Sequence, residues 1–480
     1  MINRKKRFLW WPGGVRSFVI YGAITIFCFF AFQQIDINHT AGSSYALLDG
    51  HISDFYSHNA KTFITNNYLI STYVVFALWN SPLHILGLSG EPGMDAGWRV
   101  FWYKLLPVLF LIASMLVLVR IGRVAGFGDA LSRSLSVMWI LSPVLFFSQF
   151  IFGQYDVLTV FFSLLGLLFY LERRTLLFVL AFGIAATFKY FPLLLFLPML
   201  LYVEKRVSRI AGWFFLALVP VAVEMLVYAF SPEFRTGVLG FSAVSRIFSA
   251  GIGIGSGTSI SLFFAAWLVL CGIAYWRDPE EKTFLQWALY FPMAVAVLMF
   301  SLVLWHPQWL LFATPFMLLT TAISVKPEFF FRLDFLFMLG LVGFTVIQFE
   351  GNVDQSMIVN GAFGGMNPYA DDPVNAFNMS KMLPKKYKDL FYTLVSVVFF
   401  VHIVFKFPLL RQVGLASVDR IQASWKTVRR VFLAGVMIFI LPAIAAFLFS
   451  GTSVPVYSLA GKPGLHPKDS VVVNQENPAR

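Results

Sequence analysis

Long apolar runs separated by short blocks of Lys and Arg dominate this chain of 480 residues. With 58% hydrophobic and only 12% charged residues, the sequence is more apolar than a soluble protein of this size. Apolar runs of this length predict membrane-crossing helices, because a helix satisfies its own backbone hydrogen bonds in lipid. The sequence therefore predicts an all-α polytopic membrane protein with about 13 transmembrane helices.

The net charge of +12 arises from Lys and Arg in the segments between the apolar runs. Basic loops stay on the cytoplasmic side of a membrane, so these segments set the direction of each run. Every basic block except residues 385–388 then lies inside. We interpret the positive charge as this topological bias and expect no nucleic-acid partner.

The first apolar run, residues 18–32, follows a basic segment at residues 4–7, as in a signal sequence. No small-residue cleavage site follows it, so we expect an uncleaved first span. The segment 35–100 is a long, mostly polar extracytoplasmic loop with one moderately apolar run at 68–88. If this run crossed the membrane, the arginines at 120–133 would lie outside. We therefore interpret it as an interfacial helix with Trp79 at the water boundary.

Several later apolar runs are shorter than the roughly 20 residues that a lipid-facing span needs. We expect these short helices to lie deep in a bundle or to end at a cavity recessed into the membrane. Cys28 and Cys271 both lie inside apolar runs, which predicts packing and no disulfide or metal cluster.

Polar groups from four stretches share the predicted outer face. They are Asp36, His39, Asp49 and Asp54 of the first loop, Gln154 and Asp156, Lys189, and the Trp305-His306-Pro307-Gln308 stretch. Ionisable residues at membrane depth are costly, so each is a functional candidate.

Each group also has a purely structural interpretation. Asp36 directly follows the first span and could be a boundary residue, and the two later loop carboxylates could be ordinary solvated groups. Asp156 could cap the helix that follows it. Lys189 could extend to the surface or face an anion, and His306 could be a structural histidine.

Asp36 is followed in order by SSYALLDGHISDFY, Tyr103-Lys104, SPVLFFSQFIFGQYD and ATFKYFPLLLFLP. This succession resembles the GT-C superfamily of integral-membrane glycosyltransferases, and is most similar to the polyprenyl-phosphate-dependent mannosyl- and hexosyltransferases. The resemblance covers residues 15–205 and reaches WHPQWLLFATPFMLL at 305–319.

The resemblance implies an enzyme that moves mannose or another hexose from a polyprenyl-phosphate carrier to a hydroxyl on the extracytoplasmic face, with inversion. It implies that Asp36 is the general base. Many relatives have a second acidic residue nearby, whereas Ile37-Asn38 follow here, so Asp49 and Asp54 stay alternatives. It further implies that Lys189 and His306 lie near the leaving phosphate.

The chemistry of the residues is consistent with this scheme. A general base contributes roughly 10²–10⁴ in rate, and a departing phosphate is stabilised by cationic donors such as Lys189, His306 and Arg246. Further pocket residues are expected in the same stretches, namely Gln154, Asp156, Tyr190 and Gln308. We expect no cofactor and no metal, since Asp371-Asp372 lie in a loop without a convincing partner.

The expected partners are the lipid-linked donor, a glycan, glycolipid or protein acceptor, and membrane lipid, in a bacterial cell membrane. Residues 1–230 form the predicted GT-C-like catalytic module. Residues 231–450 form a variable transmembrane module with external loops at 231–259 and 349–389, the first rich in Gly and Ser and expected to be mobile. Residues 451–480 are a polar tail that we expect to be extracytoplasmic and disordered.

Two other functions compete with this interpretation. A lipid-linked sugar flippase or transporter would use Glu224 as an intramembrane relay, but would also need charges near mid-bilayer, and most charges lie at the outer ends of the runs. A polysaccharide polymerase or ligase would normally use a large late loop bearing Arg and His, which the 349–389 loop lacks.

Overall fold

The computed structural model describes residues 14–61, 66–90, 97–240, 245–248, 250–349, 357–358, 360–363, 383–410 and 418–449. The described chain is helical apart from one short hairpin, which confirms the expected all-α class. The tail at 451–480 and most of the 349–389 loop, including Asp371 and Asp372, lie outside the described residues.

Among the described residues, seven helices are long and apolar enough to cross a membrane. These are α1 (Gly14–Ala31), α6 (Trp98–Val124), α12 (Val207–Val227), α15 (Glu281–Leu302), α17 (Pro327–Gln348), α20 (Lys388–Phe405) and α21 (Val418–Phe449). An eighth span results if α7 (Gly128–Ile140) is joined to the bent continuation formed by α8 (Pro143–Phe146) and η2 (Phe147–Phe152). The chain is therefore a multi-pass membrane protein.

Four further apolar helices have only 13 to 15 residues. They are α9 (Val157–Leu171), α10 (Thr175–Phe188), α11 (Phe191–Val203) and α14 (Leu262–Trp276). At about 1.5 Å of rise per residue, such helices are shorter than a hydrocarbon core of about 30 Å. The expected count of about 13 crossings is thus not confirmed, although short helices were expected in this region.

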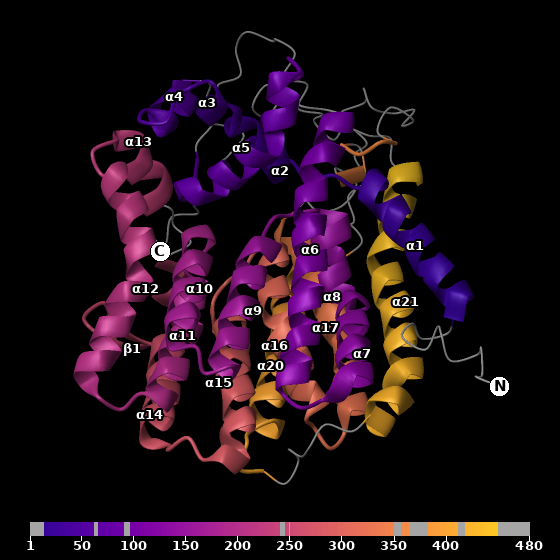
Figure 1. The fold of residues 1–480 in the computed structure, drawn as a ribbon. Helices are drawn as coiled ribbons and strands as arrows, with labels where there is room; N and C mark the ends of the chain where they lie inside the picture. Colours follow the sequence, from indigo (N-terminus) through magenta and orange to yellow (C-terminus); the bar gives the residue numbers. More distant parts are fainter. Residues whose placement is uncertain are drawn as a thin grey trace, which may run out of the picture.

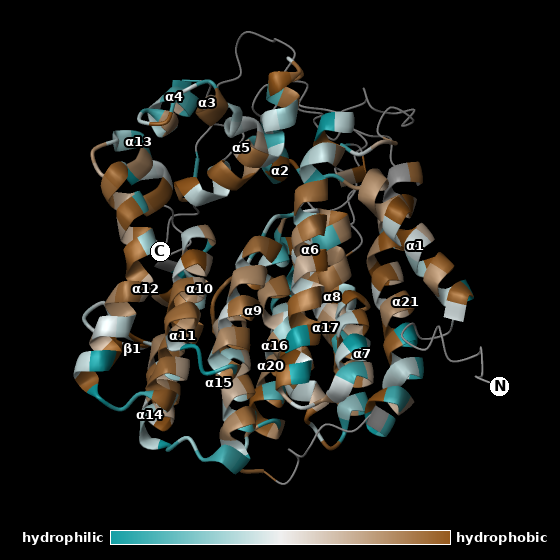
Figure 2. Ribbon diagram, in the orientation of Figure 1, coloured by the Kyte–Doolittle hydropathy of each residue, from teal (hydrophilic) through white to brown (hydrophobic). Residues whose placement is uncertain are grey.

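Short helices cover one end of the bundle. Figure 1 shows them across the upper ends of the long helices. They are α2 (Asp36–Ser43), α3 (Tyr45–Leu48), α4 (Phe55–Lys61) and α5 (Ile70–Ile85). The helix α5 occupies the run expected at the interface, and it is not among the candidate spans. Figure 2 shows that the long helices are mostly hydrophobic along their length, with polar residues concentrated in the end segments.

The segment expected to be a mobile external loop contains regular structure instead. It includes α13 (Pro232–Phe234), η3 (Arg235–Leu239), η4 (Ser245–Phe248), and the antiparallel strands β1 (Gly251–Gly255) and β2 (Thr258–Ser261). Gly255 and Gly257 adopt φ values of 103° and 73°, which a tight turn requires and which glycine tolerates. The glycines therefore form a hairpin turn within the segment that we expect to be mobile.

The remaining elements lie late in the chain. They are η5 (Pro307–Ala313), α16 (Thr314–Ala322) and η7 (Lys385–Tyr387). The helix α16 is buried along its whole length and α15 along most of it, so the second half of the chain supplies much of the core. The segment η5 contacts both η2 and α9, which brings the Trp305–Gln308 stretch to the end of the bundle where α9 begins.

Candidate active site

The candidate site is built where α2, the turn before α9, the end of α10 and η5 meet. Asp36 is the first residue of α2, only five residues after α1 ends. Gln154 Nε2 donates a hydrogen bond of 2.7 Å to Asp36 Oδ2. Residues separated by more than 100 positions in the sequence therefore form a carboxylate–carboxamide pair.

Lys104 fixes the chain that leads to Asp36. Its side chain is on α6 and is only 2% exposed. Lys104 Nζ donates to Phe32 O at 2.8 Å and also to Phe29 O. These carbonyls belong to the C-terminal end of α1, where backbone acceptors lack helical partners and a cation is favoured. Lys104 is therefore a positioning residue for Asp36.

Gly153 positions Gln154, the second residue of the carboxylate–carboxamide pair. It ends η2 with φ of 74°, in the left-handed region that L-residues avoid. A Cβ atom at this position would lie 3.0 Å from Lys104 Cε. The turn that aims Gln154 at Asp36 therefore depends on a glycine.

We expect Gly153→Ala to destabilise the protein by about 1–2 kcal/mol, because a left-handed backbone costs that much for a residue with a Cβ. We also expect it to lower transfer activity, because the turn that positions Gln154 is disturbed. Thermal unfolding in detergent and a transfer assay measure both effects. Gly22→Ala is the matched control, since a Cβ at that helical position has nothing within 4 Å. Equal stability of the two variants would contradict this role of Gly153.

Asp156 and Lys189 form a buried ion pair. Lys189 Nζ lies 3.2 Å from Asp156 Oδ1, and the two side chains are 11% and 6% exposed. Asp156 stands at the N-cap of α9 but makes no side-chain capping hydrogen bond. The capping interpretation is therefore wrong, and the carboxylate instead compensates the cation at the end of α10.

Two aromatic side chains complete the surroundings of Lys189. The ammonium lies 4.4 Å from the centroid of the Tyr68 ring and 5.4 Å from that of Trp309. Lys189 Nζ also donates to the Tyr68 hydroxyl at 3.4 Å. Cation–π contacts of this kind strengthen when the cation is desolvated, so Lys189 is held in place from three sides.

Arg246 and Lys189 are within electrostatic range of His306. Burial, together with the charges of Arg246 and Lys189, lowers the pKa of His306 to about 3. The imidazole is thus neutral at neutral pH, packed against Phe349 and Trp309. His306 offers a neutral hydrogen-bonding group, which corrects our expectation that it would contribute positive charge.

The side chain of Asp36 is partly buried. Burial raises the pKa of its carboxyl, while His39, a hydrogen bond to Gln34 and the charge of Lys189 oppose that rise. Asp156 adds a further rise by like-charge repulsion. Asp36 is thus a carboxylate with increased proton affinity, within electrostatic range of a buried ammonium.

Other predicted residues lie outside this cluster. Asp54 pairs with His51 at 3.2 Å and Asp49 faces His84 at 3.8 Å, and both carboxylates are about half exposed. Tyr190 packs at the edge of a separate hydrophobic cluster.

Gln308 and Glu224 have different surroundings. Gln308 lies buried in η5, within the stretch that supplies His306. Glu224 accepts hydrogen bonds from the backbone and hydroxyl of Ser71, so it ties α12 to the start of α5.

Two residues of the site, Tyr68 and Trp309, are not predicted from the sequence. Their contacts with Lys189 depend on tertiary packing, which the sequence pattern does not specify. His39, which is a candidate from the sequence, stands three residues after Asp36 and so lies on the same face of α2.

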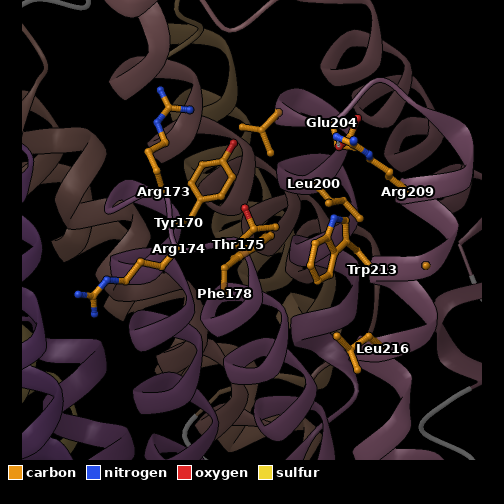
Figure 3. Close-up of a pocket in the computed structure, with 12 residues that line it drawn as sticks. Tyr170, Arg173, Arg174, Thr175, Phe178, Leu200, Glu204, Arg209, Trp213 and Leu216 are labelled. Carbon is orange, nitrogen blue, oxygen red and sulfur yellow. Dashed lines mark ion pairs between the residues drawn. The ribbon is translucent and has the colours of Figure 1, made fainter.

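A cavity of about 580 Å³ lies at the ends of α9, α10 and α11 that are farthest from the candidate site. Its lining comes from the α9–α10 turn, the end of α11 and the start of α12 (Figure 3). Figure 3 shows Arg173 and Arg174 on one side of it, and Glu204 with Arg209 on the other. It contains none of the predicted site residues, so it does not form part of the candidate active site.

A buried carboxylate beside a desolvated cation in a membrane protein is a candidate functional site. The model of glycosyltransferase family 87 matches residues 74–327, just over half of the chain. The chain belongs to this family of GT-C-type membrane glycosyltransferases. The match includes Asp156, Lys189 and His306 and begins after Asp36. No curated protein and no solved structure matches the chain.

Proposed function

We propose that this glycosyltransferase moves a hexose, such as mannose, from a polyprenyl-phosphate carrier to a hydroxyl acceptor on the extracytoplasmic face of a bacterial cell membrane. The observation that supports this most is the gathering of Asp36, Gln154, Asp156 and Lys189 at one end of the short helices. The basic turn at 172–174 lies at the other end, which the positive-inside rule assigns to the cytoplasm.

The proposed step is a single displacement. The acceptor hydroxyl attacks the anomeric carbon while its proton passes to a carboxylate oxygen of Asp36. The bond from the anomeric carbon to the phosphate oxygen breaks, and the polyprenyl phosphate leaves with the electron pair. Lys189 and Arg246 stabilise the negative charge that develops on the phosphate. Attack opposite the leaving group inverts the anomeric configuration.

Buried polar atoms around the cluster favour a polyhydroxylated ligand. Gln154 Oε1, Gln308 Oε1 and Trp309 Nε1 are buried and have no hydrogen-bond partner within the described part of the chain. Buried polar groups in proteins are normally paired, so each unpaired group needs an explanation. A sugar supplies both donors and acceptors through its hydroxyl groups.

The alternatives have less support. Glu224, the expected relay of a flippase, is bound to Ser71, which gives it a structural role. Membership of a glycosyltransferase family also favours group transfer over transport.

The pH dependence of transfer should report the buried base. Burial raises the pKa of Asp36 above its ordinary value, and only the deprotonated form accepts a proton. Activity is therefore retained above that raised pKa and lost as the pH falls through it. We expect the acid limb of kcat/KM to lie above the ordinary carboxyl pKa of about 3.9. An acid limb at or below that value would contradict a buried base.

The donor class can be tested directly. Membranes containing the protein are supplied with radiolabelled polyprenyl-phosphate hexoses and, separately, with the corresponding nucleotide sugars. We expect transfer only from the lipid-linked donors, with inversion at the anomeric carbon. Transfer from nucleotide sugars after the pool of lipid-linked sugar has been depleted would refute the proposal.

A further inference from the structure

A compact group of potential metal ligands lies in the first loop, apart from the candidate active site. It consists of His51, Asp54 and His58. One ligand atom from each residue lies within 4.8 Å of the other two. His51 Nδ1 is 3.2 Å from both carboxylate oxygens of Asp54, and the rings of His51 and His58 stack with centroids 3.6 Å apart.

The local fold brings these three side chains together. Asp54 and His58 are four residues apart across the first turn of α4, and the His58 N–H donates to Asp54 O at 2.8 Å. This spacing places the two side chains on one helix face. His51 is fixed one turn earlier, where its backbone N–H donates to Ala46 O at 2.9 Å.

The segment that contains the ligands is firmly anchored. Phe55 and Tyr56, between the ligands, are almost completely buried. The Tyr228 hydroxyl donates to Ile52 O at 2.7 Å, which ties the segment to the end of α12. The ligands therefore stand on an ordered support, as a preformed metal site requires.

We infer that His51, Asp54 and His58 bind a divalent transition-metal ion, with Zn²⁺ as the best-matched ion. Two imidazole nitrogens and one carboxylate oxygen form a typical three-residue zinc set, which leaves a fourth position for water. Ca²⁺ and Mg²⁺ prefer ligand sets made of oxygen atoms, so they are poorly matched. Tetrahedral coordination places ligand atoms about 3.3 Å apart, so the stacked rings of His51 and His58 rotate on binding to direct one nitrogen each at the ion.

The ion has a structural role in this account. The bound metal would join the turn after α3 to α4, two elements that cover the extracytoplasmic end of the bundle. The proposed catalytic base and the phosphate-binding cations are not ligands of this site. The inference therefore stands or fails independently of the proposed transfer reaction.

Metal binding can be measured on the full-length protein in detergent, after tag removal and chelator treatment. Zn²⁺ is titrated against a chromophoric chelator, and Co²⁺ binding is followed by its visible absorption. We expect one equivalent per chain, with affinity at least about tenfold lower in His51→Ala and in His58→Ala. We also expect Zn²⁺, but not Mg²⁺ or Ca²⁺, to raise the Tm of the unmodified protein.

His84→Ala is the matched control. His84 is another partly exposed histidine of the first loop, and it faces a single carboxylate, Asp49, at 3.8 Å. We expect this variant to bind Zn²⁺ as the unmodified protein does. Absence of stoichiometric binding, or equal affinity in the His51→Ala, His58→Ala and His84→Ala variants, would overturn the inference. Because the readouts are binding and thermal stability, failure of the transfer reaction cannot produce either result.

Discussion

Replacing Asp36 by asparagine should reduce transfer by roughly 10²–10⁴, which is the contribution of a general base, and should leave the fold intact. The asparagine side chain has the same shape as the aspartate, and its carbonyl oxygen can still accept the hydrogen bond from Gln154 Nε2. What the substitution removes is the proton acceptor for the acceptor hydroxyl. The variant is assayed with a radiolabelled polyprenyl-phosphate hexose, and its thermal unfolding is compared with that of the unmodified protein.

Asp49→Asn provides the control for this experiment. Asp49 is a carboxylate of the same loop, but it is more than half exposed and faces His84. We expect this variant to retain activity. Full activity in Asp36→Asn, or loss of activity in a folded Asp49→Asn variant, would move the base away from Asp36.

Replacing Lys189 by methionine should affect both stability and donor use. The variant leaves Asp156 as a buried carboxylate without its cation, and breaking a buried pair in this way costs about 3–5 kcal/mol. The loss of the ammonium also removes positive charge from the site of the leaving phosphate. We therefore expect a lower Tm. We also expect a lower kcat/KM for the lipid donor, measured as the slope of rate against donor concentration at low donor levels.

A double variant separates these two effects. In Lys189→Met with Asp156→Leu, no buried charge is left without a partner, and apolar replacement of a buried pair is often neutral for stability. We expect the double variant to recover most of the lost stability and to stay impaired in transfer. Recovery of normal donor saturation in the double variant would show that Lys189 has a structural role only.

The boundaries between polar and apolar sequence predicted much of the site. Asp36, Gln154, Asp156, Lys189 and His306 were each selected because they interrupt or end apolar runs, and alternating helix direction placed them on one side. The structure brings these residues together at one end of the short helices. The side of the membrane on which each helix end lies follows from the apolar runs and the basic loops between them. Both features can be read from a single sequence.

Pairwise contacts could not be predicted in the same way. The sequence offered capping as one role for Asp156, whereas its partner in the structure is Lys189, 33 positions later. The clamp between Lys104 and the carbonyls at the end of α1 joins residues more than 70 positions apart. Such contacts depend on which helices pack together, and apolar periodicity does not specify helix partners.

A second cluster of buried ionisable residues was not predicted from the sequence. Asp334 lies within electrostatic range of Lys406, and His402 is 1% exposed. Lys406 Nζ donates to Met317 O at 2.8 Å and to Thr321 Oγ1 at 2.7 Å. These hydrogen bonds tie the end of α20 to α16, which gives the buried lysine a structural explanation.

Sidedness is the most direct test of the account, because a lipid-linked donor requires the site to face away from the cytoplasm. Single cysteines are introduced at two exposed positions, Ala60→Cys on α4 and Lys282→Cys at the start of α15, after Cys28→Ala and Cys271→Ala. Sealed right-side-out vesicles are then treated with a membrane-impermeant maleimide. We predict labelling of the cysteine at position 60 in intact vesicles and of that at position 282 only after permeabilisation. The reverse pattern would place the Asp36 and Lys189 end in the cytoplasm and would contradict the proposed reaction.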